Sequence, residues 1–241
     1  MSQREHWDDE AETWALYARS AEHDRLYWLF HRQDFLDLLP TAGRLTVDIG
    51  AGEGRLTAAL ASLGHAVVAI DGSPRLARMA TERSELDAVA IADAARLPLR
   101  PGVADLVVAF MCLQDIENLD EVTAEIARAL SPGGRFCLAI AHPTRSAGGF
   151  VAKEPDSDFV VRHSYFDSRP WPWRHSHSGI AFELMGIHRP LERYGRALER
   201  AGLLIEALRE PVPPDHAVRD RPLRRWQRIP AFLHIRAVKA G

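Results

Sequence analysis

The sequence predicts an α/β fold built on a mostly parallel β-sheet with a ligand site at a glycine-rich turn. The first observation is that residues 45–60 read as a strand, a tight turn and a helix: an apolar run precedes Gly50, Gly52 and Gly54, and a helical apolar spacing follows them. The second is that short apolar runs and helical patterns alternate through most of the chain, which is typical of strands joined by helices.

The composition fits one globular domain, residues 1–241. Of the 241 residues, 46% are hydrophobic and 26% are charged, which is enough for a sizeable core. A net charge of −3 and a pI of about 6.4 favour neither nucleic-acid nor membrane binding. The first residues are charged and no apolar run approaches the ~20 residues of a membrane helix, so a cytoplasmic location is expected. Cys112 and Cys137 are expected to be buried, reduced core thiols.

The glycine turn indicates which ligand the site does not suit. Glycine allows positive φ and a close approach of the backbone, and the following helix N-terminus presents free N–H groups. The spacing is D-x-G-x-G-x-G from Asp48 to Gly54, and Arg55 stands where a dinucleotide fingerprint would carry its third glycine. An NAD-dependent oxidoreductase is therefore the nearest enzymatic alternative but not the favoured one.

Acidic residues follow the next two predicted strands. Asp71 comes directly after the apolar run 65–70, where a carboxylate can accept hydrogen bonds from both hydroxyls of a ribose. Ser73 and Pro74 then open a helix, as an N-cap and a first helical residue. Asp93 follows the run 88–92, and it either accepts a hydrogen bond from an adenine amino group or serves only as a turn residue.

The remaining elements complete the α/β pattern. Residues 106–110 are a fourth, buried strand; a helix over 119–130 stops at the turn 131–134; residues 135–141 are a fifth strand. A helix over 190–201 precedes two final strands, at 203–208 and 232–238.

Two segments do not belong to this core. Residues 7–39 read as one or two amphipathic helices rich in aromatic residues, which either pack on the sheet or form a lid. The stretch 144–188 is too long and too aromatic for a plain connection, which favours a functional insertion. The chain therefore divides into a helical lid (1–40), a ligand-binding core (41–143), a substrate-side insertion (144–189) and a C-terminal helix with strands (190–241).

Four signals in this order resemble the class I S-adenosylmethionine (SAM)-dependent methyltransferases, specifically their small-molecule, type 11-like group. They are VDIGAGEG at 47–54, Asp71, IADA at 91–94 and LSPGGRF at 130–136. The resemblance implies a Rossmann-like, seven-stranded, mostly parallel sheet with an antiparallel last strand and helices on both faces. It also implies SAM as cofactor and S-adenosylhomocysteine as product. The cofactor-binding residues it implies are Asp48, Gly50, Ala51, Gly52, Gly54, Asp71, Gly72, Ser73, Asp93, Ala94, Phe110 and Met111.

The acceptor site is predicted from the lid and the insertion. Both carry aromatic residues suited to an apolar wall. The candidate substrate-binding residues are Trp14, Tyr17, Gln114, Tyr165, Trp171 and Trp173, and Asp115 beside Gln114 could face either ligand. A base is needed when the acceptor arrives protonated, and histidine is the usual one near neutral pH, so His142 and His163 are the candidates. His175 and His177 could pair as metal ligands, but no third ligand stands at a telling spacing from them, so no metal is expected.

The resemblance therefore implies methyl transfer to an oxygen, nitrogen or carbon atom of a small organic molecule, with secondary metabolism as one setting. One alternative is a SAM-binding protein of the same fold that catalyses another reaction, such as a cyclisation. A second alternative is a nucleic-acid methyltransferase. The only feature in its favour is the group of basic residues between 219 and 228, and the segment FMCLQD after the fourth strand is atypical of that class. The sequence indicates neither the acceptor nor the oligomeric state.

Overall fold

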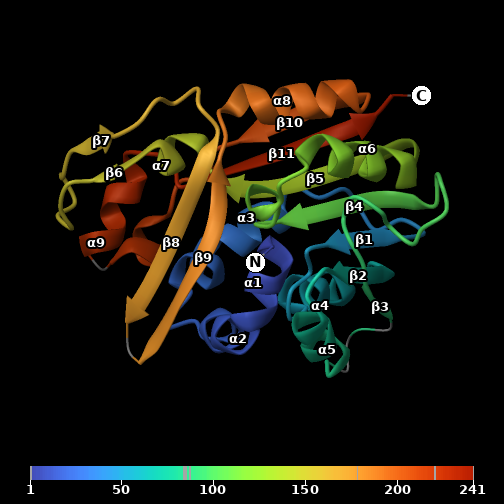
Figure 1. Cartoon of the computed structure of the whole chain (residues 1–241), viewed down its shortest axis with the longest axis horizontal. Helices are drawn as coiled ribbons and strands as arrows, with labels where there is room; N and C mark the ends of the chain where they lie inside the picture. Colours follow the sequence, from blue (N-terminus) through green and yellow to red (C-terminus); the bar gives the residue numbers. More distant parts are fainter. Residues whose placement is uncertain (1, 84–85, 87, 178, 220, 241) are drawn as a thin grey trace.

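The computed structural model of the chain describes residues 2–83, 86, 88–177, 179–219 and 221–240. A seven-stranded sheet forms its centre, in the order β10-β11-β5-β4-β1-β2-β3 (Figure 1). Its strands are β1 (Thr46–Ile49), β2 (Val67–Asp71), β3 (Ala88–Ile91), β4 (Ala104–Phe110), β5 (Leu130–Ala141), β10 (Leu203–Arg209) and β11 (Phe232–Lys239). Strand β11 is antiparallel to both of its neighbours, and the pairs from β5 to β3 are parallel. The predicted sheet with its antiparallel last strand is therefore confirmed.

Helices cover both faces of this sheet. The helix α6 (Leu119–Ala129) packs against α8 (Leu191–Arg200) on one face. On the other face, α3 (Arg32–Leu36) and α4 (Arg55–Ser62) bury apolar side chains. The helix α5 (Pro74–Thr81) packs against β2 and β3. The remaining helical segments are α1 (Gln3–Asp9), α2 (Ala11–Arg19), η1 (Tyr27–His31), η2 (Leu113–Asp115), α7 (Pro143–Ala147), η3 (Asp215–Val218), α9 (Arg221–Arg224) and η4 (Arg225–Gln227). Among the described residues, no helix is long and apolar enough to cross a membrane.

The two-residue period of the strands decides which side chains reach which face. In β4, Val107 and Ala109 pack into the core beneath α6, whereas Val108 and Phe110 pack into the core with α4. In β1, Val47 and Ile49 face α6, so the intervening Asp48 faces α4. This alternation places a carboxyl group inside an otherwise apolar layer.

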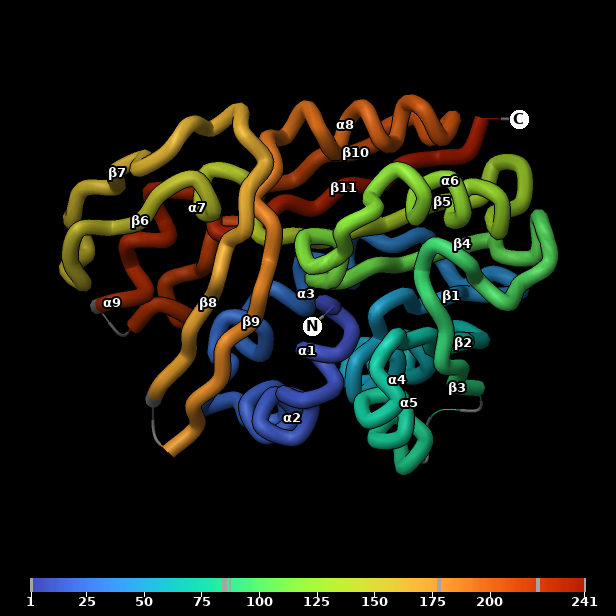
Figure 2. The backbone as a smooth tube through the Cα atoms, viewed as in Figure 1, coloured from blue at the N-terminus to red at the C-terminus, as the bar shows by residue number. Residues whose placement is uncertain are grey.

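The insertion forms two small antiparallel sheets. Strands β6 (Gly148–Phe150) and β7 (Phe159–Val161) pair near α9, and β8 (Arg169–His177) pairs with β9 (Ile180–His188) in a long hairpin. The N-terminal helix α1 contacts both β9 and α5, so it lies between the hairpin and the sheet core (Figure 2). The N-terminal helices and the insertion therefore meet.

Two local predictions were inaccurate. The N-terminal segment is broken into α1, α2, η1 and α3, and it starts at Gln3 rather than Trp7. The turn at 131–134 interrupts the pairing of β5 with β4 rather than preceding β5: Leu130 pairs with Ala104, and Arg135 pairs with Leu106 after a register shift. Gly133, at φ +73°, allows this bulge.

Candidate active site

The glycine turn between β1 and α4 has the positive-φ backbone that its sequence predicts. Gly50, Gly52 and Gly54 have φ of +65°, +59° and +83°. A Cβ on Gly50 would lie 2.5 Å from the Cβ of Cys112, so a side chain there would displace the loop after β4. A Cβ on Gly52 would meet no atom within 4 Å, because this residue borders a cavity. The turn thus brings bare backbone to an open space.

Gly54 has a different role from the one that the sequence suggests. It caps the start of α4, and a Cβ there would lie 2.7 Å from the side chain of Leu86. It is absent from the residues that line the cavity. The need for glycine at position 54 is therefore explained by the helix start and by packing. The structure does not place Gly54 at the cavity.

Asp48 is a buried carboxyl group at the base of the cavity. It is 1% exposed, and the hydroxyl of Thr57 on α4 donates to its Oδ2 at 2.6 Å. Burial raises the pKa of Asp48 to about 7; the hydrogen bond from Thr57 opposes this shift. Among the described residues no cation forms an ion pair with it. A cationic ligand group would therefore find an acceptor already in place.

Asp71, at the end of β2, organises the neighbouring turn. Its Oδ2 accepts a hydrogen bond from the Gly52 amide at 2.7 Å, and its Oδ1 accepts one from the Ser73 amide at 2.8 Å. Burial raises the pKa of this carboxyl, and the two amide hydrogen bonds oppose the shift. Each oxygen keeps further acceptor capacity, so Asp71 can hold the turn and still accept ligand hydroxyls.

A cavity of about 320 Å³ lies at the carboxyl ends of β1, β2, β3 and β4. Ser73 caps α5 beside Asp71, and Asp93 accepts a hydrogen bond from the Ala95 amide after β3. Met111, directly after β4, adopts φ +57°, which is uncommon for a residue with a side chain and often marks a functional site. The predicted cofactor residues that line this cavity are Asp48, Gly50, Ala51, Gly52, Asp71, Gly72, Ser73, Asp93, Ala94, Phe110 and Met111.

The helix α1 also lines this cavity, which the sequence reasoning missed. Gln3, Arg4 and Trp7 contribute to the lining. The helix is fixed to α5 by Asp8, whose Oδ1 accepts hydrogen bonds from the Ser73 hydroxyl at 2.6 Å and from the Arg75 amide at 2.9 Å. The signal was present as S-x-x-E at residues 2–5, which forms a capping box in the structure.

The loop after β4 brings an acid and a thiol to the same cavity. Asp115 lines it, and Gln114 donates to Asp115 Oδ2 at 3.0 Å without lining the cavity itself. Burial raises the pKa of Asp115 to about 8, and the Gln114 hydrogen bond opposes this. Cys112 was expected in the core, but it is only half-buried and lines the cavity; Cys137 is fully buried as expected. Burial raises the pKa of both thiols, so both stay protonated.

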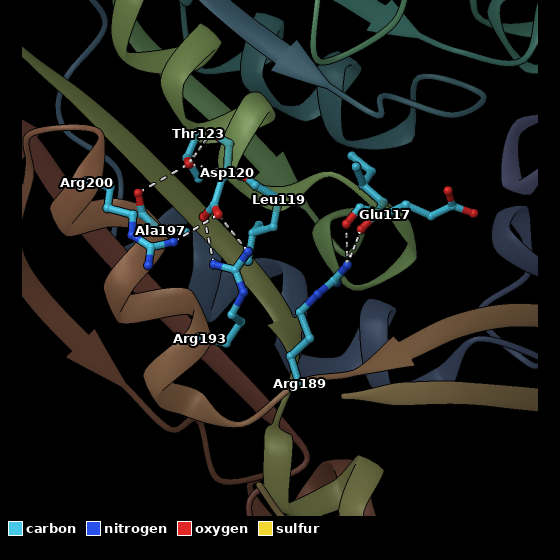
Figure 3. A network of polar contacts seen from close by, with 9 residues as sticks. Glu117, Leu119, Asp120, Thr123, Arg189, Arg193, Ala197 and Arg200 are labelled. Carbon is cyan, nitrogen blue, oxygen red and sulfur yellow. Dashed lines mark hydrogen bonds and ion pairs between the residues drawn. The ribbon is translucent and has the colours of Figure 1, made fainter. Parts of the chain in front are cut away.

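A buried arginine at the end of the insertion holds this loop in place. Arg189, which is 5% exposed, donates to the carbonyls of Leu113, Ile116 and Glu117. Figure 3 shows its guanidinium reaching the backbone at Glu117. A guanidinium with several donors can satisfy carbonyls that an irregular loop leaves unpaired. The insertion therefore determines the position of Asp115 through a residue outside the cavity.

Neither candidate histidine lies in the cavity lining. His142 caps α7: its Nδ1 accepts the Thr144 amide at 3.0 Å, and its Nε2 lies 2.9 Å from Glu210 Oε1. Burial lowers the pKa of His142, and Glu210 opposes the shift. His163 is exposed in the loop before β8. Both ring nitrogens of His142 have partners and His163 is remote from the cavity, so neither is placed to take a proton there.

The aromatic candidates separate into three groups. Trp14 lines the cavity. Tyr17 and Trp173 pack with Phe182 in a cluster that joins α2 to the hairpin β8–β9. Tyr165 accepts the Leu191 amide through its hydroxyl at 3.1 Å, and Trp171 lies against Arg145. Of these residues only Trp14 is at the cavity, because the hairpin packs its aromatic side chains mainly against α2.

Comparison with known proteins agrees with this geometry. A family described as "Methyltransferase domain" matches residues 47–138. A demethylmenaquinone methyltransferase from Tropheryma whipplei is 33% identical over 113 residues, which cover 46% of this chain and 47% of that protein. A malonyl-acyl-carrier-protein O-methyltransferase from Geobacter sulfurreducens is 39% identical over 99 residues, which cover 39% of this chain and 37% of that protein. The chain thus spans about half the length, or less, of these relatives.

Solved structures extend the similarity to the whole fold. A SAM-dependent methyltransferase from Mesorhizobium loti has 25% identity and a TM-score of 0.71, and the match covers 86% of this chain and 96% of that one. The matched family region, residues 47–138, contains the glycine turn, Asp71, Asp93 and the loop after β4. The region that matches the family model therefore supplies most of the cavity lining.

Proposed function

We propose that the chain is a class I SAM-dependent methyltransferase and that it transfers the methyl group of SAM to a small organic acceptor. The observation that carries the proposal is the meeting of the glycine turn with Asp48 and Asp71 at one cavity. A carboxyl group on each of two adjacent strands suits a ligand with an ammonium at one end and ribose hydroxyls further along.

The residues around the cavity fit SAM in a definite orientation. Asp48 would pair with the amino group of the methionine part, and Asp71 would accept the ribose hydroxyls while it holds Gly52. Asp93 and Ala94 would border the adenine, which leaves Phe110 and Met111 next to the reactive centre. Trp14 and α1 border the other side and would exclude water.

Bound SAM supplies a methyl group already activated on a sulfonium. The residues of this chain then have to align the acceptor, keep the site dry and receive a proton if the acceptor carries one. We assign the proton to Asp115, because its carboxyl lines the cavity beside Met111 and has a pKa raised by burial toward the working pH. A base with a pKa near the ambient pH is the most effective for this step.

Titration calorimetry with SAM, S-adenosylhomocysteine and NAD tests the cofactor. SAM and S-adenosylhomocysteine should bind, and NAD should not. Release of S-adenosylhomocysteine from a panel of phenols, amines and carbon acids then tests the transfer. SAM binding without release of the product over the whole panel would contradict methyl transfer to these acceptor classes and favour another reaction, such as a cyclisation.

The variant Asp115→Asn tests the base. It should bind S-adenosylhomocysteine as the parent does but lower kcat by roughly 10²–10⁴-fold with a hydroxyl or ammonium acceptor. His142→Gln is the comparison, because this residue lies outside the cavity lining; its kcat should change far less. The reverse ranking of the two variants would contradict the assignment.

A further inference from the structure

Arg145 is a half-buried arginine among aromatic rings. It lies in α7, directly after β5, on the side of the molecule that also carries α9 and the hairpin β8–β9 (Figure 1). Its guanidinium carbon is 5.0 Å from the ring centre of Trp226, 5.4 Å from Phe232 and 6.0 Å from Trp171. Ring faces attract the cation, but they offer no acceptors for its five N–H donors.

No anion in the described part of the chain pairs with this guanidinium. Among the described residues, no hydrogen bond or ion pair reaches Arg145, and its nitrogens are not among the fully enclosed unpaired atoms. Asp24 is the carboxylate that acts on it electrostatically, but Arg55 already pairs with Asp24 at 2.7 Å. Burial lowers the pKa of Arg145 to about 10, and Tyr17 and Asp24 oppose the shift, so the group stays charged at neutral pH.

This corner adjoins the candidate active site. Phe232, beside Arg145, stacks on His31 with 3.6 Å between ring centres. His31 is 4.6 Å from Phe110, which lines the cavity. His31 is 2% exposed and its Nε2 has no hydrogen-bond partner among the described residues. A continuous series of ring contacts, from Phe232 through His31 to Phe110, therefore connects Arg145 with the wall of the cavity.

We propose that Arg145 binds a carboxylate or phosphate group of the methyl acceptor, so that the enzyme acts on an anionic small molecule. The proposal rests on the methyl-transfer function proposed above. An arginine surrounded by aromatic rings holds such a group with two parallel hydrogen bonds, and the rings lower the local dielectric and form a wall for the apolar part of the acceptor.

Calorimetry on the full chain saturated with S-adenosylhomocysteine tests this proposal. The probes are 4-hydroxyphenylacetate, its uncharged amide and phenyl phosphate, so that carboxylate and phosphate are measured separately against a neutral ligand of similar shape. At least one anionic probe should bind roughly ten- to a hundredfold more tightly than the amide. Arg145→Gln should abolish that preference, and Arg145→Lys should restore part of it.

The matched control is Arg225→Gln. Arg225 also lies over an aromatic ring, Phe150 at 5.0 Å, but it already donates to the carbonyl of Ala152 at 2.7 Å. This variant should keep the preference for the anion. Equal binding of anion and amide by the parent, an unchanged preference in Arg145→Gln, or no probe binding to protein that binds S-adenosylhomocysteine would overturn the anion site. Failure to bind S-adenosylhomocysteine itself would instead overturn the proposed function.

Discussion

Asp71 joins two turns of the cavity through one carboxylate. It accepts amide hydrogen bonds from Gly52 and Ser73, and we assign the ribose hydroxyls to the same oxygens. Asp71→Ala should therefore weaken S-adenosylhomocysteine binding by about 2 kcal/mol, roughly thirtyfold in Kd. Calorimetry measures the change. Asp105→Ala is the control, because that carboxylate pairs with Arg44 away from the cavity; equal losses in both variants would contradict the assignment.

We expect Asp48 to make cofactor binding depend on pH. Its pKa of about 7, raised by burial, means that the ligand-free protein holds a proton which the unfolded chain loses near pH ~3.9. The folded state then binds more protons between about pH 4 and 7, so the contribution of Asp48 to the free energy of unfolding falls as the pH rises across that window. An ammonium pairs with the ionised form, so SAM should bind more tightly as the pH rises to about 7.

Calorimetry at a series of pH values measures this linkage. The affinity should rise by up to about tenfold per pH unit below the pKa and level off above it. Asp48→Asn should remove that slope while any contribution from Asp115 remains. Identical pH profiles for the parent and Asp48→Asn would assign the linkage to another group.

Residue roles were predictable only where the sequence position fixes the environment. Asp48 lies within the first predicted strand, two residues before the glycine turn, and Asp71 directly follows the second, so their place near that turn could be read in advance. The contact of His142 with Glu210 could not, because these two residues are far apart in the sequence. From the sequence, Asp115 could be expected to face either ligand, but its burial could not be predicted. That burial depends on β9, which packs against η2 from the insertion.

The loop after β4 depends on an element far away in the chain. Arg189→Ala would remove three hydrogen bonds from a buried guanidinium and leave the Ile116 carbonyl without its donor, while the Leu113 and Glu117 carbonyls keep one backbone N–H donor each; it should lower the free energy of unfolding by about 3 kcal/mol. Arg193→Ala is the control, because Arg193 pairs with the half-exposed Asp120 (Figure 3), and it should cost at most about 1 kcal/mol. Denaturant unfolding compares them. A larger loss for Arg193→Ala would show that the loop does not need Arg189.

Helix α1 is too short to be stable alone, so its position depends on Asp8. Asp8→Ala removes two hydrogen bonds to the start of α5, and it should speed the dissociation of S-adenosylhomocysteine several-fold and raise hydrogen exchange in residues 3–9. Stopped-flow and exchange measurements test both effects. Asp9→Ala, which alters an exposed neighbour, should change neither. Unchanged dissociation in Asp8→Ala would mean that α1 does not retain the ligand.

Elements with a regular hydrophobic period were predictable, and irregular ones were not. The seven core strands are apolar runs at regular spacing, and all seven occur in the structure. The insertion is a hairpin whose strand β8 carries Pro170 and Pro172, which argue locally against a strand. Its pairing with β9 and its packing on α2 override that preference. Contacts between segments far apart in the sequence therefore decided its structure.

At the scale of the molecule, α2 and the hairpin β8–β9 form one apolar unit over the substrate side. Phe182 lies at its centre, with ring centres 5.2 Å from Tyr17, 5.3 Å from Trp173 and 5.8 Å from Trp14. Because Trp14 also lines the cavity, movement of this unit would open the site. The two segments should therefore loosen together and not one at a time.

Phe182→Ala tests whether they do. Removing this ring should cost the unit about 3 kcal/mol, because a buried aromatic side chain leaves a cavity among its neighbours. Hydrogen exchange should then rise together in residues 11–19 and 169–188, while β1 and β4 keep their protection because they belong to separate cores. Phe166→Ala, at a side chain 78% exposed, should leave exchange unchanged. Faster exchange in the hairpin alone, with α2 still protected, would show that the cover opens in parts and that α2 stays on the core without it.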